Sequence, residues 1–281
     1  MNVEDAIKFA AKEIDKSELN AEADIDARYL VSHVLQKDFT WLRAWQDKEL
    51  SDQQEFALEA IVQRRKSGEP IAYITGEKDF WTLTLETNAS TLIPRPETEL
   101  LVEKALDYLF EKPKAKVLDL GTGTGAIALA IATERQNDTI VATDYVQEAV
   151  ELAKRNAQKN NINNVIILQS DWFLNMTESR FDLIVCNPPY VEENDPHLKQ
   201  GDLRFEPLTA LTASDNGLAD IKIIIEESKS RLVQGGMLMI EHGYQQASDL
   251  KILFQKFGYQ KIDVIKDLSG LERISTGIFL Q

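Results

Sequence analysis

A regular alternation of strand-type and helix-type segments after Pro113 constrains the fold of this chain more than any other feature. Short apolar runs alternate with longer segments whose apolar residues recur at helical spacing. This pattern favours an open parallel sheet with helices on both faces, an α/β fold. The predicted strands are Lys116–Leu120, Thr139–Thr143, Val165–Leu168, Phe181–Cys186, Met237–Ile240, Ile262–Ile265 and Gly277–Leu280; the predicted helices are Ala126–Glu134, Glu148–Lys159, Leu218–Leu232 and Gln245–Phe257.

The part before the alternation divides into a helical and a β-rich segment. Within residues 1–70, Ala21–Leu35 has apolar residues at helical spacing, and Ser51 with Gln54 forms a capping-box pattern. Residues 71–93 are rich in β-branched and aromatic residues around Gly76, which suits a β-hairpin. We therefore expect a helical domain over 1–70, a hairpin linker over 71–93 and an α/β domain over 94–281. A long polar insertion, Glu192 to Gly217, is expected to be functional or disordered.

The charge of the chain indicates which partners are disfavoured, and its cysteine content indicates the cellular compartment. The net charge is −15, with 11 basic and 17 acidic residues up to Leu85 and 20 and 29 beyond it. Both parts are acidic, which disfavours naked DNA or RNA as a direct partner. A single cysteine, no signal-type N-terminus and no long apolar segment predict a cytoplasmic protein without membrane association.

The strand Phe181–Cys186 is followed at once by Asn187-Pro188-Pro189-Tyr190. Each proline restricts the residue before it to extended conformations, and neither can donate a backbone hydrogen bond. The result is a rigid corner with an amide side chain, free carbonyls and an aromatic ring, suited to hold a planar NH₂ group. The plain alternative is a strand-ending turn that contains an asparagine by chance.

Between the first predicted strand and helix lies a glycine-rich loop, Gly121, Thr122, Gly123, Thr124 and Gly125. Its glycines permit close approach of a ligand to the backbone, and the following helix offers free N–H groups. Asp144 ends the second strand 19 residues after Gly125, where a carboxylate is placed to accept hydrogen bonds from ribose hydroxyls. Trp172, after the third strand, either stacks on adenine or packs in the core. The G-x-G-x-G spacing resembles the S-adenosylmethionine loop of Rossmann-like methyltransferases and differs from dinucleotide and P-loop patterns.

Taken together, these motifs resemble the HemK/PrmC family of glutamine N5-methyltransferases, which modify the Gly-Gly-Gln motif of peptide chain release factors. The resemblance covers nearly the whole chain. It rests on Arg65 with Gly68-Glu69-Pro70, Tyr73-Ile74 with Gly76, Leu92-Ile93-Pro94-Arg95-Pro96-Glu97-Thr98-Glu99, Asp119–Gly125, Asn187–Tyr190, Glu206-Pro207 with Ala210-Leu211, and Asp267–Arg273, which has Leu271 where the family more often has Arg. The resemblance implies a helical substrate-recognition domain, a hairpin linker, a seven-stranded methyltransferase domain, S-adenosylmethionine as methyl donor and a role in translation termination. We expect a monomer.

On this basis Asn187, Pro188 and Tyr190 are the predicted catalytic residues, and Pro189 joins them in binding the substrate amide. The Asn187 side-chain oxygen and the Pro188 carbonyl would each accept one amide hydrogen, while Tyr190 packs on the amide plane. Asn187 also joins the predicted cofactor set of the glycine loop, Asp144 and Trp172. No general base is evident. We expect structural or surface roles for His33, His197 and His242, no metal site, and a role for Cys186 as a small core residue.

Three other functions are compatible with parts of this pattern. An adenine-N6 methyltransferase of nucleic acid shares the Asn-Pro-Pro-Tyr motif, but the acidic charge disfavours it. A non-catalytic interaction module would be expected to carry a damaged glycine loop or corner, and neither is seen. A dinucleotide oxidoreductase conflicts with the glycine spacing and lacks a Tyr-Lys or His pair.

Overall fold

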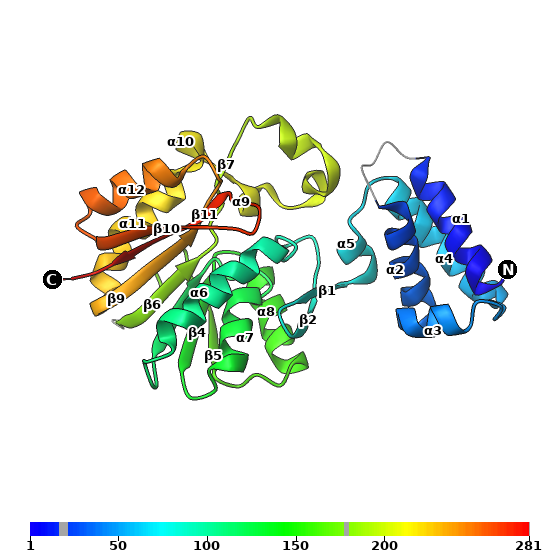
Figure 1. Cartoon of the computed structure of the whole chain (residues 1–281), viewed down its shortest axis with the longest axis horizontal. Helices are drawn as coiled ribbons and strands as arrows, with labels where there is room; N and C mark the ends of the chain where they lie inside the picture. The colour runs from blue at the N-terminus through cyan, green and yellow to red at the C-terminus, as the bar shows by residue number, and fades with distance from the viewer. Residues whose placement is uncertain (17–21, 177–179, 281) are drawn as a thin grey trace. The chain divides into compact units, whose positions relative to one another are not determined.

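The computed structural model describes residues 1–16, 22–176 and 180–280. Its residues form two compact units, one of Met1–Glu77 with Pro196–Phe205 and one of Lys78–Asp195 with Glu206–Gln281 (Figure 1). The expected helix start at Ala21 and the last residue of the expected α/β domain, Gln281, lie outside the described residues.

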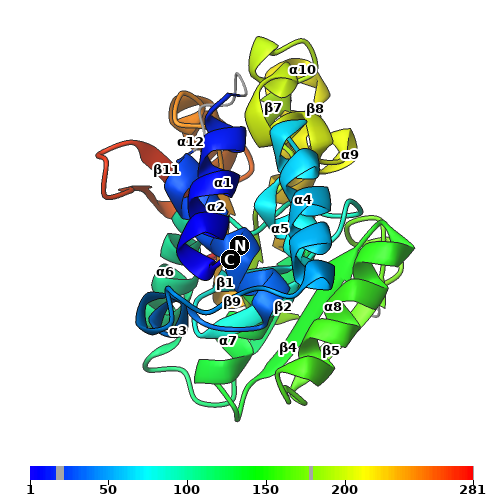
Figure 2. The same cartoon turned by 90° about the vertical axis from the view of Figure 1, so that its right-hand side faces the viewer.

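The first unit is helical. Its helices are α1 (Val3–Asp15), α2 (Ala23–Leu35), α3 (Phe39–Ala44), α4 (Asp52–Lys66) and α5 (Ile71–Thr75). Helices α1, α2 and α4 lie side by side and bury a common apolar core (Figure 2). The predicted capping box is confirmed, because the Ser51 and Gln54 side chains each bond to the other's backbone N–H.

Helix α5 differs from the extended structure expected at the start of residues 71–93. The Pro70 carbonyl accepts a hydrogen bond from the Ile74 N–H over 3.1 Å, and Gly76 ends the helix with a φ of +76°. Ala72 and Ile74 are buried, so tertiary packing overrides the β propensity of this segment. The hairpin itself follows as β1 (Glu77–Phe80) and β2 (Leu83–Glu86).

The polar insertion after the Asn-Pro-Pro-Tyr corner is built of short elements. Its central part, η2 (Pro196–Lys199) and η3 (Gly201–Phe205), belongs to the helical unit. There the Arg65 guanidinium binds Asp26 through Nε at 2.7 Å and Asp202 through Nη1 at 3.0 Å. The flanking elements belong to the second unit and are β7 (Val191–Glu192), α9 (Leu208–Leu211), β8 (Thr212–Ala213) and α10 (Ser214–Gly217).

Among the described residues, the central sheet of the second unit has seven strands in the order β10-β11-β9-β6-β3-β4-β5. They are β3 (Lys116–Leu120), β4 (Thr139–Asp144), β5 (Val165–Gln169), β6 (Phe181–Cys186), β9 (Leu232–Glu241), β10 (Gln260–Lys266) and β11 (Glu272–Ile278). The α/β prediction is confirmed, with one difference from a purely parallel sheet. Strand β11 runs antiparallel to both β9 and β10, because a tight turn rather than a helix joins β10 to β11.

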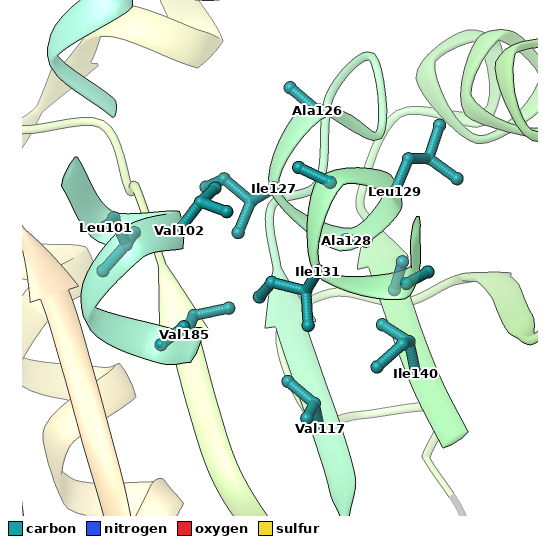
Figure 3. Close-up of a cluster of buried hydrophobic side chains, with 14 of the residues drawn as sticks. Leu101, Val102, Val117, Ala126, Ile127, Ala128, Leu129, Ile131, Ile140 and Val185 are labelled. Carbon is teal, nitrogen blue, oxygen red and sulfur yellow. The ribbon is translucent and has the colours of Figure 1, made fainter. Parts of the chain in front are cut away.

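Helices cover both faces of this sheet. Helices α6 (Glu99–Leu109), α7 (Ala126–Glu134) and α8 (Gln147–Lys159) share one core with alternate strand residues such as Val117 and Val185 (Figure 3). Helices α11 (Ala219–Arg231) and α12 (Ala247–Lys256) pack with the intervening residues, such as Leu118, on the other face. The central strands β3 and β6 are therefore buried on both faces, which explains why their sequences are mostly apolar.

Candidate active site

Strands β3, β4, β5 and β6 are parallel, so the loops after them meet at one edge of the sheet. A cavity of about 320 Å³ lies at this edge, entirely within the second unit. Eight of the predicted site residues line it: Gly121, Thr122, Gly123, Thr124, Asp144, Trp172, Asn187 and Pro189. Gly125, Pro188 and Tyr190 adjoin those residues in the chain without lining the cavity. Such an edge is where ligands of open α/β sheets bind.

The glycine loop is shaped by backbone angles that other residues adopt only with strain. Gly121, Gly123 and Gly125 have φ of +70°, +55° and +88°. A Cβ on Gly125 would also lie 3.0 Å from the Leu129 side chain. The loop is anchored by Asn156 of α8, whose Nδ2 donates to the Thr124 carbonyl over 2.9 Å. The loop is therefore a fixed surface at the start of α7.

Asp144 lines the cavity and holds the glycine loop. One of its carboxylate oxygens accepts the Gly123 N–H over 2.8 Å and the other accepts the Val146 N–H over 2.9 Å. A carboxylate has about four acceptor positions, so each oxygen retains capacity for a further donor. Burial raises the pKa of Asp144, and the backbone hydrogen bonds partly oppose that shift.

A second carboxylate, Asp119, is buried beneath the same loop. It accepts the Thr122 hydroxyl over 2.6 Å and the Ala128 N–H over 3.3 Å. Its other oxygen, Oδ1, has no hydrogen-bond partner among the described residues. Burial raises the pKa of Asp119 to about 7, since these hydrogen bonds only partly compensate the desolvation of the charged form.

Trp172 lies over the glycine loop and carries backbone strain. Its φ is +43°, an unusual value for a bulky residue. Its six-membered ring would lie 3.6 Å from a Cβ on Gly121. A hydrogen bond from the Trp172 side chain to Asp220 opposes the rise in the pKa of Asp220 that burial causes. The Trp172 ring lines the cavity and also packs against the hydrophobic core. The core contact and the hydrogen bond to Asp220 therefore hold the ring in place.

The Asn-Pro-Pro-Tyr corner ends β6 as predicted. The Asn187 Nδ2 donates to the Thr98 hydroxyl oxygen over 3.2 Å. The Tyr190 carbonyl accepts the Gln246 Nε2 over 3.1 Å, and a Cβ on Gly217 would lie only 2.0 Å from that carbonyl oxygen. Burial raises the pKa of Tyr190 to about 12, so its phenol is neutral. The corner is thus held at both ends.

The segment Ile93-Pro94-Arg95 contributes Pro94 and Arg95 to the lining of the cavity. Glu206 binds it twice, by accepting the Ile93 N–H over 2.9 Å and by an ion pair with Arg95. The Glu206 side chain is buried, whereas that of Arg95 is partly exposed.

His242 and Cys186 are both buried and make specific contacts, in agreement with the structural roles predicted for them. The ring of His242 is buried and bonds to the Gly243 carbonyl and the Ser275 hydroxyl, each at 2.9 Å. Cys186 is buried, its thiol lies 3.0 Å from the Leu120 carbonyl oxygen, and burial raises its pKa. Within the described parts of the chain, no cluster of three or more His, Cys, Asp or Glu side chains could hold a metal ion.

Sequence reasoning missed residues that fix the site from elements distant in the chain. These residues are Asn156, Glu206, Gly217, Asp220 and Gln246. Thr98 and Glu206 lie in segments that carried the family resemblance, but nothing in the sequence assigned them a contact. The spacing of residues along one strand or helix predicts which face of that element is buried. These contacts join side chains from separate elements, so such spacing does not predict them.

The lining of the cavity suits a cationic nucleoside-type cofactor. Asp144, Asp171 and Asp220 supply negative charge, the glycine loop offers backbone N–H groups, and the Trp172 ring offers an apolar surface. S-adenosylmethionine has a ribose, an adenine ring, an ammonium group and a sulfonium centre, so its groups match this donor and acceptor set.

Comparisons with known proteins agree with this geometry. Residues 96–202 match the methyltransferase small domain, and residues 5–76 match the PrmC N-terminal domain. A methyltransferase from Pyrococcus furiosus has the same fold, with a TM-score of 0.55 and 23% identity over 79% of this chain and 98% of that one. A 16S rRNA N2 G1207 methyltransferase from T. thermophilus, in complex with AdoMet and guanosine, has a TM-score of 0.52 and 20% identity over 72% of this chain and 49% of that one.

The fold and the site thus define a methyltransferase. The release factor glutamine methyltransferase of Escherichia coli is 50% identical over 256 residues, which are 91% of this chain and 92% of that protein. The protein of the same name from Haemophilus influenzae is 44% identical in a comparison that covers 99% of each chain. This chain belongs to the release factor glutamine methyltransferase family, and the resemblance found in its sequence is confirmed. No described helix is long and apolar enough to cross a membrane.

Proposed function

We propose that this chain transfers a methyl group from S-adenosylmethionine to the side-chain amide nitrogen of the glutamine in the Gly-Gly-Gln motif of peptide chain release factors. The observation that carries the proposal is the position of Asn187. Its amide lies in the wall of the same cavity as the glycine loop, with its nitrogen committed to Thr98. Its oxygen is therefore the atom available to a donor in the cavity.

The cofactor is assigned to the part of the cavity formed by the glycine loop, Asp144 and Trp172. Asp144 would accept hydrogen bonds from the ribose hydroxyls while it keeps the Gly123 N–H. The Trp172 ring would cover the adenine, because Asp220 and the core hold it in place. When bound, S-adenosylmethionine supplies an electrophilic methyl group on a sulfonium centre.

The corner is assigned to the substrate amide. In this proposal the Asn187 Oδ1 and the Pro188 carbonyl each accept one hydrogen of the glutamine NH₂ group, and Tyr190 packs on the amide plane. Asn187 and Pro189 line the cavity, and Pro188 and Tyr190 adjoin them in the chain. An amide nitrogen is a weak nucleophile, since its lone pair is delocalised into the carbonyl. Two acceptors favour charge that develops on this nitrogen and hold it in line for attack. Positioning of this kind reaches effective molarities of ~10⁵ M or more in intramolecular reactions.

The release of the amide proton needs no protein base in this scheme. The His242 ring is engaged by Gly243 and Ser275, and the pKa of the Tyr190 phenol is raised to about 12. After methyl transfer the nitrogen is strongly acidic, so water takes the proton.

We assign substrate recognition to the helical unit, with residues 71–93 as the linker to the methyltransferase domain. The protein acts in the cytoplasm, as a monomer, on a protein substrate and without direct nucleic-acid binding. Its acidic charge of −15 disfavours a phosphate backbone as substrate.

The test is methyl transfer from labelled S-adenosylmethionine to purified release factor, compared with a variant release factor whose Gly-Gly-Gln glutamine is replaced by alanine and with double-stranded DNA. We expect label, and the mass gain of one methyl group on that glutamine, only with the intact release factor. Transfer to DNA, or equal transfer to the alanine variant, would overturn the proposal.

A further inference from the structure

Two residues from other elements, Thr98 and Glu241, lie against the Asn187 side chain. Thr98 ends the short helix η1 (Pro96–Thr98), and Glu241 ends β9. The pairing of β6 with β9 places Cys186 beside Ile240, so the residues that follow, Asn187 and Glu241, are also neighbours. Thr98 lines the cavity, whereas Glu241 does not.

Glu241 is an acidic side chain in an almost fully buried position. It is 4% exposed, and its Oε2 has no hydrogen-bond partner in the described residues. Hydrogen bonds from the Thr98 and Asn187 side chains oppose a rise in its pKa, which burial nevertheless brings to about 7. Burial of a carboxylate costs free energy unless its oxygens are paired with hydrogen-bond donors or cations. Glu241 is not fully paired, and it does not line the cavity. The free-energy cost of its burial therefore suggests a role through the side chains that it contacts.

We propose that Thr98 and Glu241 are positioning residues that fix which end of the Asn187 amide faces the substrate. This inference rests on the proposed function, in which the Asn187 side-chain oxygen accepts a hydrogen bond from the substrate amide. The Asn187 Nδ2 donates to the Thr98 oxygen over 3.2 Å, and the Thr98 hydroxyl donates in turn to Glu241. An ionised carboxylate only accepts hydrogen bonds. The Glu241 carboxylate, which is the last acceptor in this series of hydrogen bonds, therefore sets the direction of both bonds.

The direction matters because an amide group has two ends of similar size and opposite hydrogen-bonding character. With Nδ2 turned toward Thr98 and Glu241, the Oδ1 faces the cavity as an acceptor. The opposite orientation would place Oδ1 beside the carboxylate and would present an N–H donor to the NH₂ donor of a glutamine side chain. Both contacts would be unfavourable, so the pair selects the orientation that binds an amide NH₂ group.

The charged and titratable groups around Glu241 come from several elements. Arg273 of β11 favours its ionised form, and Glu97 of η1 disfavours that form. Tyr190 and Cys186 on the side of β6 are both neutral, with raised pKa values. The adjacent His242 ring is bonded to Gly243 and Ser275 instead. Arg273 forms its ion pair with Asp267, so it acts on Glu241 only at longer range.

The test uses Thr98→Val, which removes the hydroxyl at nearly constant volume, Thr98→Ser, which restores it, and Glu241→Gln. We expect kcat for release factor methylation to fall about 10- to 100-fold in Thr98→Val and about tenfold in Glu241→Gln, and to stay within about threefold of wild type in Thr98→Ser. The dissociation constant of S-adenosylhomocysteine, measured by calorimetry, should change less than about threefold in all three.

The pH profile provides a readout that a purely structural role would not change. Protonation turns Glu241 into a donor, so wild-type kcat should fall as the pH drops below about 7. In Glu241→Gln this fall should disappear. Asp138→Asn is the matched control, because Asp138 is a buried carboxylate that binds Arg135 and the Ala115 N–H before β4. It should lower the melting temperature and leave kcat and the profile unchanged.

A measurement without turnover separates this inference from the proposed function. The side-chain NH₂ resonances of ¹⁵N-labelled asparagines are recorded, and that of Asn187 is identified by its loss in Asn187→Ala. Thr98→Val and Glu241→Gln should shift this resonance and speed its hydrogen exchange, whereas Asp138→Asn should not. Unchanged Asn187 signals, or a kcat that falls only with the folded fraction, overturn the inference. A wild-type enzyme that fails to methylate release factor overturns the proposed function alone.

Discussion

The Gly123 N–H donates a hydrogen bond to the Asp144 carboxylate over 2.8 Å, across the cavity edge from β3 to β4. This bond makes Asp144 part of the loop's structure as well as a candidate ribose ligand. Asp144 also lines the cavity, and its carboxylate retains acceptor positions for the donors of a ligand. Replacement of Asp144 should therefore affect the cofactor site in two ways.

We expect Asp144→Ala to weaken S-adenosylmethionine binding by about 10- to 100-fold, since it removes charged hydrogen bonds worth about 1.5–3 kcal/mol. Asp144→Asn should lie between wild type and Asp144→Ala, because its amide oxygen can still accept the Gly123 N–H. Calorimetric titration measures the dissociation constants. The control is Glu148→Gln, which removes one exposed charge from the first turn of α8. An unchanged dissociation constant in Asp144→Ala would exclude a ribose-binding role.

Asn187→Ala should separate turnover from cofactor affinity. The substitution removes an acceptor that acts on charge developing at the substrate nitrogen, so kcat should fall about 10²- to 10³-fold. Cofactor affinity should change only a few-fold, as Asn187 is one of several lining residues. Single-turnover kinetics and calorimetry provide the two values. Equal losses in both would mean that Asn187 mainly holds the cofactor.

Gly217→Ala tests whether the close contact between Gly217 and the Tyr190 carbonyl helps to place the Asn-Pro-Pro-Tyr corner. Gly217 has a φ of +77°, and a Cβ there would lie 2.0 Å from the Tyr190 carbonyl oxygen. Gly235 has the same φ with nothing within 4 Å of its added Cβ, so Gly235→Ala carries the backbone strain without the clash. We expect Gly235→Ala to cost about 1–2 kcal/mol of unfolding free energy with kcat unchanged.

The Gly217→Ala variant should cost more than that control and should also lower kcat, because the end of the Asn-Pro-Pro-Tyr corner must move. Urea unfolding and steady-state methylation report the two effects. If both alanine variants behaved alike, the contact with Tyr190 would have no role in placing the corner.

Arg65→Ala should destabilise the helical unit and release the insertion segment that it holds. Arg65 is buried and binds Asp26, Asp202 and the Glu69 carbonyl. Removal of one partner of a buried pair costs about 3–5 kcal/mol. Arg65→Lys should recover only part of this loss, since an ammonium group cannot span the partners of a guanidinium fork.

The control for Arg65 is its neighbour Arg64, whose ion pair with Glu69 is partly exposed. Arg64→Ala should cost less than about 1 kcal/mol. Urea unfolding gives these values, and amide hydrogen exchange over residues 196–205 should rise in Arg65→Ala alone. Equal exchange in the two variants would contradict the anchoring role.

The buried acids Asp119 and Glu241 should make the cofactor-free protein less stable as the pH rises. Burial raises the pKa of each to about 7, so between about pH 4 and pH 7 the folded state binds more protons than the unfolded state. Stability then falls with increasing pH by up to about 1.4 kcal/mol per pH unit for each group. Asp119→Asn and Glu241→Gln should each flatten the dependence of the melting temperature on pH over this window. A stability that rises across it in wild type and variants alike would refute the assignment.

The sequence predicted the parts of the fold that depend on local pattern. The limits of α7 and β6 and the capping box at Ser51 follow directly from apolar spacing and capping chemistry. Three features followed from tertiary contacts instead. Ile71–Thr75 is helical although its residues favour strands, β11 runs antiparallel, and Pro196–Phe205 groups with the helical unit.

For the site, the sequence alone determined which motifs meet at one sheet edge, because loops after parallel strands share that edge by geometry. It therefore predicted that the glycine loop, Asp144 and Asn187 lie together, and the three line one cavity. Only the tertiary structure decided how these groups are oriented. Thr98 and Glu241 reach Asn187 from η1 and β9, and contacts between elements so distant in the chain leave no periodic signal in the sequence.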